Sequence, residues 1–319
     1  MLLQQLAIFA ISCSLLVFSG SLLVRSLVRV GGFLNISGFM LSFIIMAFST
    51  SLPELLVGIR SAMMGSPALA LGNIIGSNVA DVTLVAGITA LLSKGFRTTP
   101  LVRKNAYAMV AIVGIATALT YIGDGLSRID AIVLLAILCV HTYALYKHKD
   151  HEKPLNNHYS KWELVSAAGI IPVTIAVLML SADFVVQSGI TLAGELALPV
   201  LFVGLFFIAI GTSLPELAFE ARAALARRDD IAMGDLIGSL VVNSTLILAT
   251  VALISPFSPG KLFYISSFFM LTVCLLFAVM CESYNQITWK EGIVLLMMYA
   301  LFIMVEFTVQ GLTIHTTPL

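Results

Sequence analysis

Long apolar runs of about 20 residues, separated by short polar segments, make up most of the chain. Such runs are long enough to cross a bilayer as helices. The first run lacks the basic start of a signal peptide and continues to Arg25 without a clear small-residue cleavage site, so we interpret it as a span as well. The pattern predicts ten spans, at residues 3–24, 36–61, 68–92, 103–122, 129–147, 163–187, 198–225, 231–254, 262–281 and 289–310.

Two stretches of these spans share one sequence pattern. Residues 47–81 and 209–243 align without a gap at an offset of 162 positions, with 15 identities in 35 positions. Five spans precede the polar linker at 147–161 and five follow it, and an odd number of spans forces the two copies into opposite orientations. We therefore predict an all-α polytopic membrane protein, with ten transmembrane helices in two inverted five-helix repeats at 1–146 and 162–319.

Composition supports the membrane class. Hydrophobic residues are 59% of the chain and charged residues only 11%, with a mean hydropathy of +1.04, whereas soluble domains have about 25% charged residues. The net charge of zero and the lack of a basic stripe give no indication of a nucleic-acid partner. The four cysteines are scattered without a metal-binding or redox spacing. We expect lipid surroundings, no cofactor and a monomeric chain.

Loop charges orient the chain, because Lys and Arg concentrate on the cytoplasmic side of membrane proteins. With the N-terminus outside, fourteen basic residues lie at inner ends and loops, and only Arg60, Arg128 and Lys261 lie at outer ones. We therefore expect a multi-pass protein of the cell (plasma) membrane, with both termini extracellular and the linker 147–161 in the cytoplasm.

Three carboxylates fall near the centres of expected spans: Glu54, Asp81 and Glu216. A carboxylate at the bilayer centre costs roughly 2.5 to 3.5 kcal/mol on insertion scales, so such residues face a cavity or a partner. The five histidines, and every Lys and Arg, lie at helix ends, in the linker or in the tail. A cation from solution is then the natural partner of these carboxylates.

Each repeat surrounds its carboxylate with further oxygen atoms. Pro53 and Pro215 remove backbone donors and are expected to kink their helices, which frees carbonyl oxygens about one turn earlier. Hydroxyl and amide groups lie at helical spacing on the same or the next span, at Thr50, Ser51 and Ser77 in the first repeat and at Thr212, Ser213, Ser239 and Asn243 in the second. Such hard oxygen ligands suit Ca²⁺ or Na⁺, so each repeat supplies half of a cation site.

The paired segments STSLPE with GNIIGSNVAD and GTSLPE with GDLIGSLVVN resemble those of the cation/calcium antiporter superfamily, most closely its sodium/calcium exchanger family of the short prokaryotic type. The resemblance covers the whole chain. It implies that Na⁺ entry drives Ca²⁺ export by alternating access at one central site. It also implies roles for the matching positions: Glu54 and Glu216 as bridging Ca²⁺ ligands, Thr50, Ser51, Ser77, Thr212, Ser213 and Ser239 as hydroxyl or carbonyl ligands, Ala47 and Ala209 as carbonyl contributors for Na⁺, and Asp81 and Asn243 as the central polar pair.

Some positions depart from this pattern. The acidic member of the central pair is Asp81, in the first repeat, whereas some family members have it in the second; because the total charge is unchanged, we expect transport to survive such a swap. Asp235 replaces the asparagine of the pattern and is interpreted either as a residue on the access path or as a solvated carboxylate. Glu220 is expected to pair with a loop arginine. Solvated or helix-capping roles are expected for Asp183 and Glu306.

Other functions fit less well. An intramembrane hydrolase would need a serine with a midmembrane histidine or a pair of catalytic aspartates, and a receptor or scaffold would not need duplicated midplane carboxylates. We therefore expect a transporter and not an enzyme. The coupling ion stays open among Na⁺, H⁺ and K⁺-assisted Na⁺, because carboxylates bind protons as well as metal cations. The Thr-Ser-Leu-Pro-Glu sequence favours Na⁺ over the proton-coupled branch of the resembled superfamily.

Overall fold

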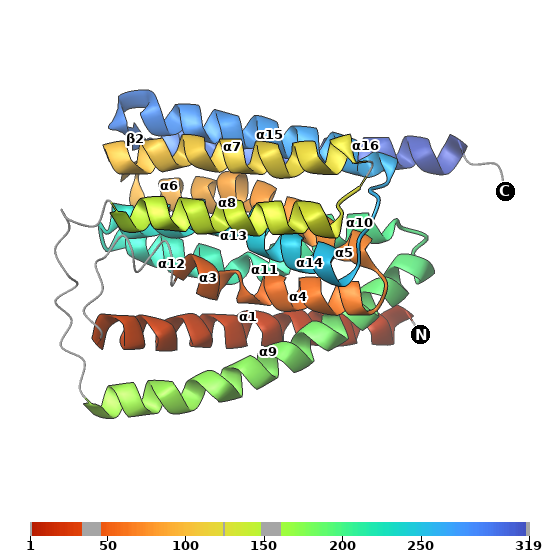
Figure 1. The fold of residues 1–319 in the computed structure, drawn as a ribbon, viewed down its shortest axis with the longest axis horizontal. Helices are drawn as coiled ribbons and strands as arrows, with labels where there is room; N and C mark the ends of the chain where they lie inside the picture. Colours follow the sequence, from red (N-terminus) through yellow and green to blue (C-terminus); the bar gives the residue numbers. More distant parts are fainter. Residues whose placement is uncertain (1, 34–45, 124, 148–160, 317–319) are drawn as a thin grey trace.

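The computed structural model describes residues 2–33, 46–123, 125–147 and 161–316. Nearly all of these residues are helical, and the helices run side by side along one direction (Figure 1). Within a bilayer a helix satisfies its backbone N–H and C=O groups inside its own segment, which is why long apolar runs take this form. The predicted all-α architecture is confirmed.

The long helices follow one another in the same order in both halves, but the short strand precedes the fourth span in the first half and follows it in the second. The first half contains α1 (Leu2–Phe33), α3 (Ala47–Thr50), α4 (Leu52–Met63), α5 (Pro67–Ala80), the π-helical segment η2 (Asp81–Val85), α6 (Ala86–Ser93), the strand β1 (Phe96–Arg97), α7 (Pro100–Ile122) and α8 (Arg128–Lys147). The second half contains α9 (Lys161–Glu195), α10 (Val200–Val203), the π-helical segment η4 (Gly204–Ile208), α11 (Ala209–Thr212), α12 (Leu214–Leu225), α13 (Asp229–Val242), the π-helical segment η5 (Asn243–Ile247), α14 (Leu248–Ile254), α15 (Lys261–Glu282), the short 3₁₀ turn η6 (Ser283–Asn285), the strand β2 (Gln286–Ile287) and α16 (Trp289–Thr316).

Nine helical stretches in the described ranges are long and apolar enough to cross a membrane. The remaining expected span, 36–61, is described only from Met46 onward, where it consists of α3 and α4; its first part lies outside the described residues. The sixth span was expected to end at 187, but α9 continues to Glu195. An apolar run gives only the minimum length of a helix, so it does not predict how far the helix continues beyond the bilayer.

The two halves are inverted repeats, as predicted. The elements α3, α4, α5 and η2 recur as α11, α12, α13 and η5, with every boundary shifted by 162 positions. Two backbone bridges are related to within one position of this offset: Phe96 pairs with Ile287 at one end of the molecule, and Leu126 pairs with Phe257 in the loops at the other end (Figure 1). Equivalent contacts at opposite ends are what an axis in the membrane plane produces.

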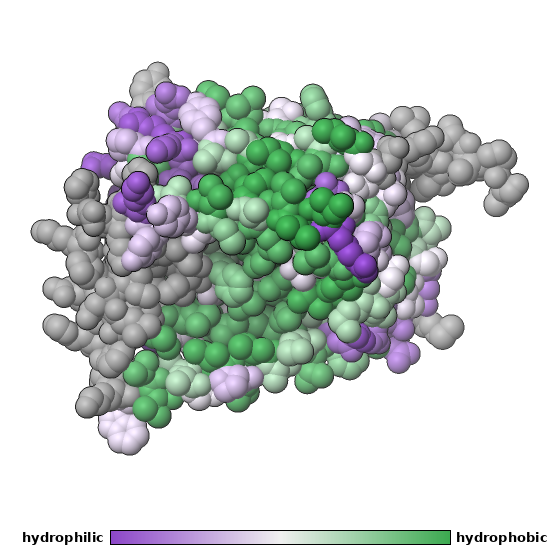
Figure 2. All heavy atoms as spheres, in the orientation of Figure 1, coloured by the Kyte–Doolittle hydropathy of each residue, from purple (hydrophilic) through white to green (hydrophobic). Residues whose placement is uncertain are grey.

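The described chain ends and the α8–α9 region lie at opposite ends of the molecule. The start of α1 and the end of α16 lie at one end, and the end of α8 and the start of α9 lie at the other (Figure 1). Figure 2 shows an apolar band across the middle of one face, with hydrophilic residues gathered toward the two ends. This distribution fits a protein whose central band contacts lipid and whose two ends contact water.

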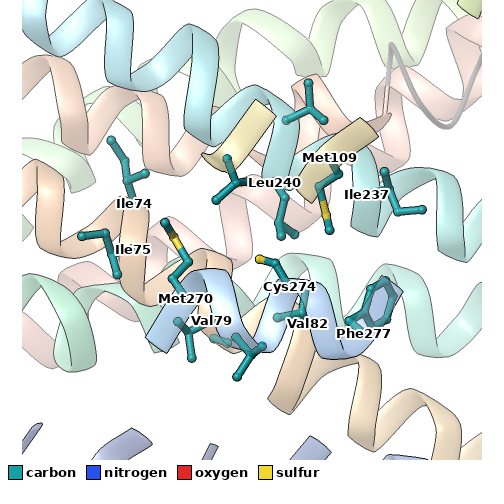
Figure 3. Close-up of a cluster of buried hydrophobic side chains, with 14 of the residues drawn as sticks. Ile74, Ile75, Val79, Val82, Met109, Ile237, Leu240, Met270, Cys274 and Phe277 are labelled. Carbon is teal, nitrogen blue, oxygen red and sulfur yellow. The ribbon is translucent and has the colours of Figure 1, made fainter. Parts of the chain in front are cut away.

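A large apolar core packs the outer helices of the bundle against α5 and α13. Ile74, Val79 and Val82 meet Met109 of α7 and Phe277 of α15 in this cluster, and all are buried (Figure 3). Methionines fill irregular gaps between helices, which explains their number in this core. The cluster holds α5 and α13 in place, and these helices carry the predicted site residues Ser77 and Ser239 and lead directly into Asp81 and Asn243.

Close contact between α5 and the second half depends on two glycines. A Cβ atom added at Gly72 would lie 2.1 Å from the Leu201 carbonyl oxygen, and one added at Gly76 would lie 2.2 Å from that of Leu205. Any side chain there would push the helices apart. Small residues at such crossings let membrane helices approach closely, so Gly72 and Gly76 set the distance between α5 and the second half.

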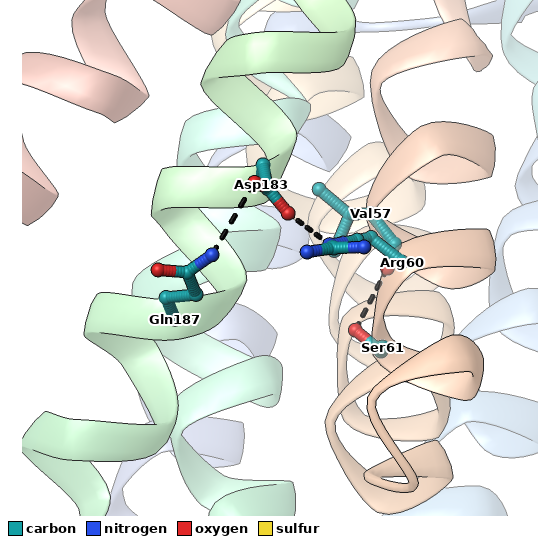
Figure 4. A network of polar contacts seen from close by, with 5 residues as sticks. All are labelled: Val57, Arg60, Ser61, Asp183 and Gln187. Carbon is teal, nitrogen blue, oxygen red and sulfur yellow. Dashed lines mark hydrogen bonds and ion pairs between the residues drawn. The ribbon is translucent and has the colours of Figure 1, made fainter.

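The helices α1 and α9 pack along each other on one side of the bundle (Figure 1). Their contact residues, such as Leu16, Leu23 and Leu178, belong to an apolar cluster separate from the main core. Asp183 of α9 forms an ion pair with Arg60 of α4 and accepts a hydrogen bond of 3.3 Å from Gln187 (Figure 4). The interpretation of Asp183 as merely solvated or capping is therefore wrong, because sequence alone did not bring Arg60 beside it.

Candidate cation site

A break in the helix precedes each of the two predicted central glutamates. The helix α3 ends at Thr50, and α4 begins one residue later with Pro53 in its first turn; Ser51 between them has φ −80° and ψ 5°. In the second half Ser213 has φ −80° and ψ 0° between α11 and α12. The missing proline donors cause these breaks. They place Glu54 and Glu216 in the first turns of α4 and α12.

The carbonyl groups at the breaks are not free acceptors. The Ala47 oxygen accepts a hydrogen bond from Ser51 N–H (3.2 Å), and the Thr50 hydroxyl oxygen lies 3.3 Å from it. The Ala209 oxygen accepts from Ser213 N–H (3.0 Å), and the Thr212 hydroxyl oxygen lies 3.2 Å from it. Both carbonyl groups therefore keep a backbone hydrogen bond and lie beside a threonine hydroxyl.

Two threonine–serine contacts cross between the halves. The hydroxyl oxygens of Thr50 and Ser239 are 3.2 Å apart, and those of Ser77 and Thr212 are also 3.2 Å apart. All four residues are buried. The break of one repeat therefore lies against the second helix of the other, so the hydroxyls predicted as separate halves form one continuous cluster.

The same threonines each hold a second partner. Thr50 donates to Asp235 Oδ1 and Thr212 donates to Asn73 Oδ1, both at 3.2 Å. Asn73 and Asp235 are symmetry mates on α5 and α13. The structure thus brings Asn73 and Asp235, which were not predicted as ligands, into contact with the threonines. Their matching positions in the two repeats are the sequence feature that could have identified them.

The two central glutamates are 1% exposed, and each leaves an oxygen without a hydrogen bond, Glu54 Oε2 and Glu216 Oε2. Glu54 lies beside the hydroxyls of Thr212 and Ser77, which come from the two halves. Glu216 lies within electrostatic reach of Glu54 and Asp81. Glu54, Asp81 and Glu216 are therefore three buried carboxylates contributed by both repeats.

Asp81 and Asn243 each begin a π-helical segment, η2 and η5. Such segments are frequent at functional sites because the extra residue re-aims side chains. Asp81 lies near Ser213, and its Oδ1 makes no hydrogen bond.

Asn243 donates to Asn78 Oδ1 at 3.1 Å, and Asn78 donates to Ser244 at 2.9 Å. Asn243 of the predicted central pair is therefore held by a second asparagine, which the sequence pattern did not assign to the site.

Basic side chains do not neutralise this cluster. The ion pair found within the described ranges, Arg60–Asp183, involves neither central glutamate. Glu220 and Asp235 are 1% and 0% exposed and form no ion pair with a described arginine. The expected arginine partner of Glu220 and the solvated interpretation of Asp235 are both wrong, because distance from a helix end does not measure burial. Glu306, expected to be solvated or capping, is also 0% exposed.

The oxygen atoms without hydrogen bonds fit a hard cation. Within the described residues no three Asp, Glu, His or Cys side chains form a metal-binding group of their own. Carboxylates, hydroxyls and amides must act together, which is the mixed ligand set that Ca²⁺ accepts. The unpaired buried oxygens at the site belong to Ser51, Glu54, Asp81, Ser213, Glu216, Glu220, Asp235 and Asn243.

The known proteins that resemble this chain include an antiporter and sodium/calcium exchangers. The putative antiporter CaxA of Alkalimonas amylolytica is 29% identical over 304 residues, covering 89% of this chain and 93% of the relative. The sodium/calcium exchanger MaX1 of Methanosarcina acetivorans is 24% identical over 325 residues, with coverage of 89% and 93%. A solved structure of the sodium-calcium exchanger NCX_Mj, soaked with 10 mM Na⁺ and zero Ca²⁺, matches with a TM-score of 0.71 and 25% identity over 95% of this chain and 99% of that chain.

The sequence profile described as "Sodium/calcium exchanger protein" matches residues 4–147 and 166–308. The two matched segments correspond to the two inverted halves of the fold. The chain belongs to the sodium/calcium exchanger protein family.

Proposed function

We propose that the protein is a secondary antiporter that exchanges Na⁺ for Ca²⁺ across the plasma membrane at one buried site. The observation that carries the proposal is the pair Glu54 and Glu216. These glutamates come from inverted repeats, are 1% exposed, and each has an oxygen that no protein group satisfies. A buried carboxylate without a partner is costly, and a bound cation removes that cost.

Charge and ligand type explain the competition between the two ions. The two glutamates carry the charge that neutralises one Ca²⁺ or two Na⁺. The crossed hydroxyls of Thr50 with Ser239 and of Ser77 with Thr212 supply neutral oxygen ligands around them. Because both ions need the same oxygens, occupation by one displaces the other, and this competition is the basis of exchange. We include Ser51, Ser213, Asp81 and Asn243 among the ligands, since all four are buried as well.

Alternating access follows from the inverted repeats. A conformation in which the site is open to one side of the membrane has a symmetry-related conformation, of similar energy, that is open to the other side. The pair α1 and α9 is the moving part in our proposal, because its apolar cluster is separate from the main core. A Cβ atom at Gly20 of α1 would lie 3.2 Å from Pro53 Cγ and 3.3 Å from Pro215 Cγ, so α1 passes over both helix breaks.

The boundaries and orientation are part of the proposal. The five-helix repeats are taken as 1–146 and 162–319, joined by a cytoplasmic linker at 147–161. Both termini are placed outside the cell, because the end of the molecule where α8 ends and α9 begins also carries most of the described basic residues. Cysteine labelling with a membrane-impermeant reagent, at the start of α1 and at the end of α8, tests this orientation.

Ca²⁺ uptake into liposomes tests the coupling ion. Liposomes that contain the purified protein are loaded with Na⁺, with K⁺, or with a buffer that creates a proton gradient, and radioactive Ca²⁺ is added outside. We expect uptake from Na⁺-loaded vesicles only. Uptake that follows the proton gradient without Na⁺ would identify an H⁺/Ca²⁺ antiporter, and uptake that needs Na⁺ together with K⁺ on one side would identify K⁺-assisted exchange.

A further inference from the structure

The second repeat carries two buried carboxylates that the first repeat lacks. Asp235 of α13 is 0% exposed; its Oδ1 accepts the Thr50 hydrogen bond of 3.2 Å, and its Oδ2 has no partner. Glu220 of α12 is 1% exposed, and its Oε1 has no partner. Glu220 and Asp235 lie at matching heights on α12 and α13, which pack against each other on either side of a short turn. The two unpaired oxygens therefore belong to neighbouring side chains.

These positions have uncharged mates in the first repeat. The mate of Asp235 is Asn73, and the mate of Glu220 is Gly58, each 162 positions earlier. A Cβ atom at Gly58 would lie 3.1 Å from Ile247 Cγ2 and 3.2 Å from Val251 Cγ2, so a glutamate has no room there. Because the repeats are inverted, the additional charge lies on one side of the central cluster only.

That side faces the end of the molecule where α8 ends and α9 begins. Asp235 lies six residues into α13, which starts at that end (Figure 1), and this corresponds to a depth of about 9 Å along a helix. Ser239 lies one turn deeper and contacts Thr50. The hydroxyl of Thr50 thus stands between the additional carboxylates and the central site.

The contacts favour a metal cation over a shared proton. Two carboxyl groups that share a proton form a short O–H···O⁻ hydrogen bond of about 2.5–2.7 Å, yet neither Glu220 Oε1 nor Asp235 Oδ2 makes a hydrogen bond. Charge gives the same answer. Glu54, Asp81, Glu216, Glu220 and Asp235 are five buried carboxylates, so one Ca²⁺ would leave three of them uncompensated and a second Ca²⁺ would leave one.

We propose that Glu220 and Asp235, with the hydroxyls of Thr50 and Ser239, form a second Ca²⁺ position on the α8–α9 end of the central site. The proposal rests on the proposed function, since it assigns the central site to Ca²⁺ as well. Two carboxylates neutralise one Ca²⁺, and the hydroxyls and the Glu220 and Asp235 oxygens provide the hard ligands it requires. The position holds an ion on its way between the α8–α9 end and the central glutamates.

Equilibrium binding of radioactive Ca²⁺ to the purified full chain in Na⁺-free buffer tests this proposal. We expect two Ca²⁺ per wild-type chain at saturation, and one per chain for the Glu220→Gln/Asp235→Asn variant. Glu306→Gln, which removes another buried carboxylate from α16, is the matched control and should still bind two. The isosteric substitutions keep the packing, and the Ca²⁺ that the first variant retains shows that its central site is folded.

The outcomes separate the two proposals. One Ca²⁺ per chain in both the wild type and the Glu220→Gln/Asp235→Asn variant would overturn the second position and leave the antiport proposal standing. A monodisperse Glu220→Gln/Asp235→Asn variant that binds no Ca²⁺ would also overturn it, because the two residues would then belong to the central site. An unchanged number in the Glu54→Gln/Glu216→Gln variant would overturn the central assignment instead.

Discussion

Thr50 donates a hydrogen bond of 3.2 Å to Asp235 across the interface between the two halves, and Thr212 makes the equivalent bond to Asn73 at the same distance. The geometry is symmetric, but the acceptors differ. One threonine stabilises a buried carboxylate and the other a neutral amide. The two repeats thus share one hydrogen-bond geometry but differ in the charge of the acceptor.

Valine at the two threonine positions should measure this difference. A hydrogen bond to a charged group contributes about 1.5–3 kcal/mol and a neutral one about 0.5–1.5 kcal/mol. We therefore expect Thr50→Val to lower the thermal unfolding temperature of the purified protein more than Thr212→Val does. Each variant also loses one serine contact of 3.2 Å, and the Thr50 hydroxyl has one further contact, with the Met46 carbonyl oxygen at 3.1 Å. Equal shifts would mean that Asp235 carries no charge when no ion is bound.

Amide substitutions at the central glutamates should remove Ca²⁺ transport. Glu54→Gln and Glu216→Gln keep the side-chain volume but remove one anionic ligand each. If the lost interaction is worth about 1.5–3 kcal/mol, Ca²⁺ affinity falls about ten- to a hundredfold, and flux into Na⁺-loaded liposomes falls with it. Glu306→Gln serves as the control with unchanged flux. Normal flux in both central variants would show that the Ca²⁺ ligands have been misassigned.

Sequence repetition accounts for how much of the site could be predicted. The copies of Thr-Ser-Leu-Pro-Glu at an offset of 162 positions located both helix breaks, and Pro53 and Pro215 gave them a physical cause. Inversion followed from the odd number of spans. These features are local or countable, so they need no knowledge of tertiary contacts.

Other features depend on packing and could not be predicted. No sequence signal marks the π-helical segments at Asp81 and Asn243, because one extra residue per turn leaves the apolar pattern of a buried helix unchanged. Glu220 and Asp235 were placed near water by their distance from helix ends, whereas neighbouring helices bury them. The contact of Asn78 with Asn243 joins residues 165 positions apart.

Alanine at Gly76 should prevent the halves from assembling normally. Its Cβ atom would lie 2.2 Å from the Leu205 carbonyl oxygen and 2.7 Å from Ala209 Cβ, and overpacking of this kind costs about 1–3 kcal/mol or more. We expect Gly76→Ala to reduce the monodisperse yield and the unfolding temperature. Gly194→Ala, with no atom within 4 Å of its added Cβ, should behave as wild type. An intact Gly76→Ala variant would contradict the close packing of α5 on η4.

Exchanging Asp81 and Asn243 tests the role of the central pair. The hydrogen bonds around Asn78 can reverse: at present it accepts from Asn243 at 3.1 Å and donates to Ser244 at 2.9 Å. With a carboxylate at position 243, a flipped Asn78 amide would donate to that carboxylate and accept from the Ser244 hydroxyl. Asn78 then keeps both of its hydrogen bonds, so we expect the site to accept the acidic residue on either repeat.

We therefore expect the Asp81→Asn/Asn243→Asp variant to keep Ca²⁺ flux within about tenfold of wild type, whereas Asp81→Asn alone, with one charge fewer, loses more. Adding Asn78→Leu should abolish the recovery in the exchanged variant, because the new carboxylate then has no donor, and buried charged groups left without one carry a penalty. Flux into Na⁺-loaded liposomes gives the measurement for all three. If Asn78→Leu leaves the flux of the exchanged variant unchanged, the hydrogen bond between Asn78 and residue 243 is not what stabilises the carboxylate there.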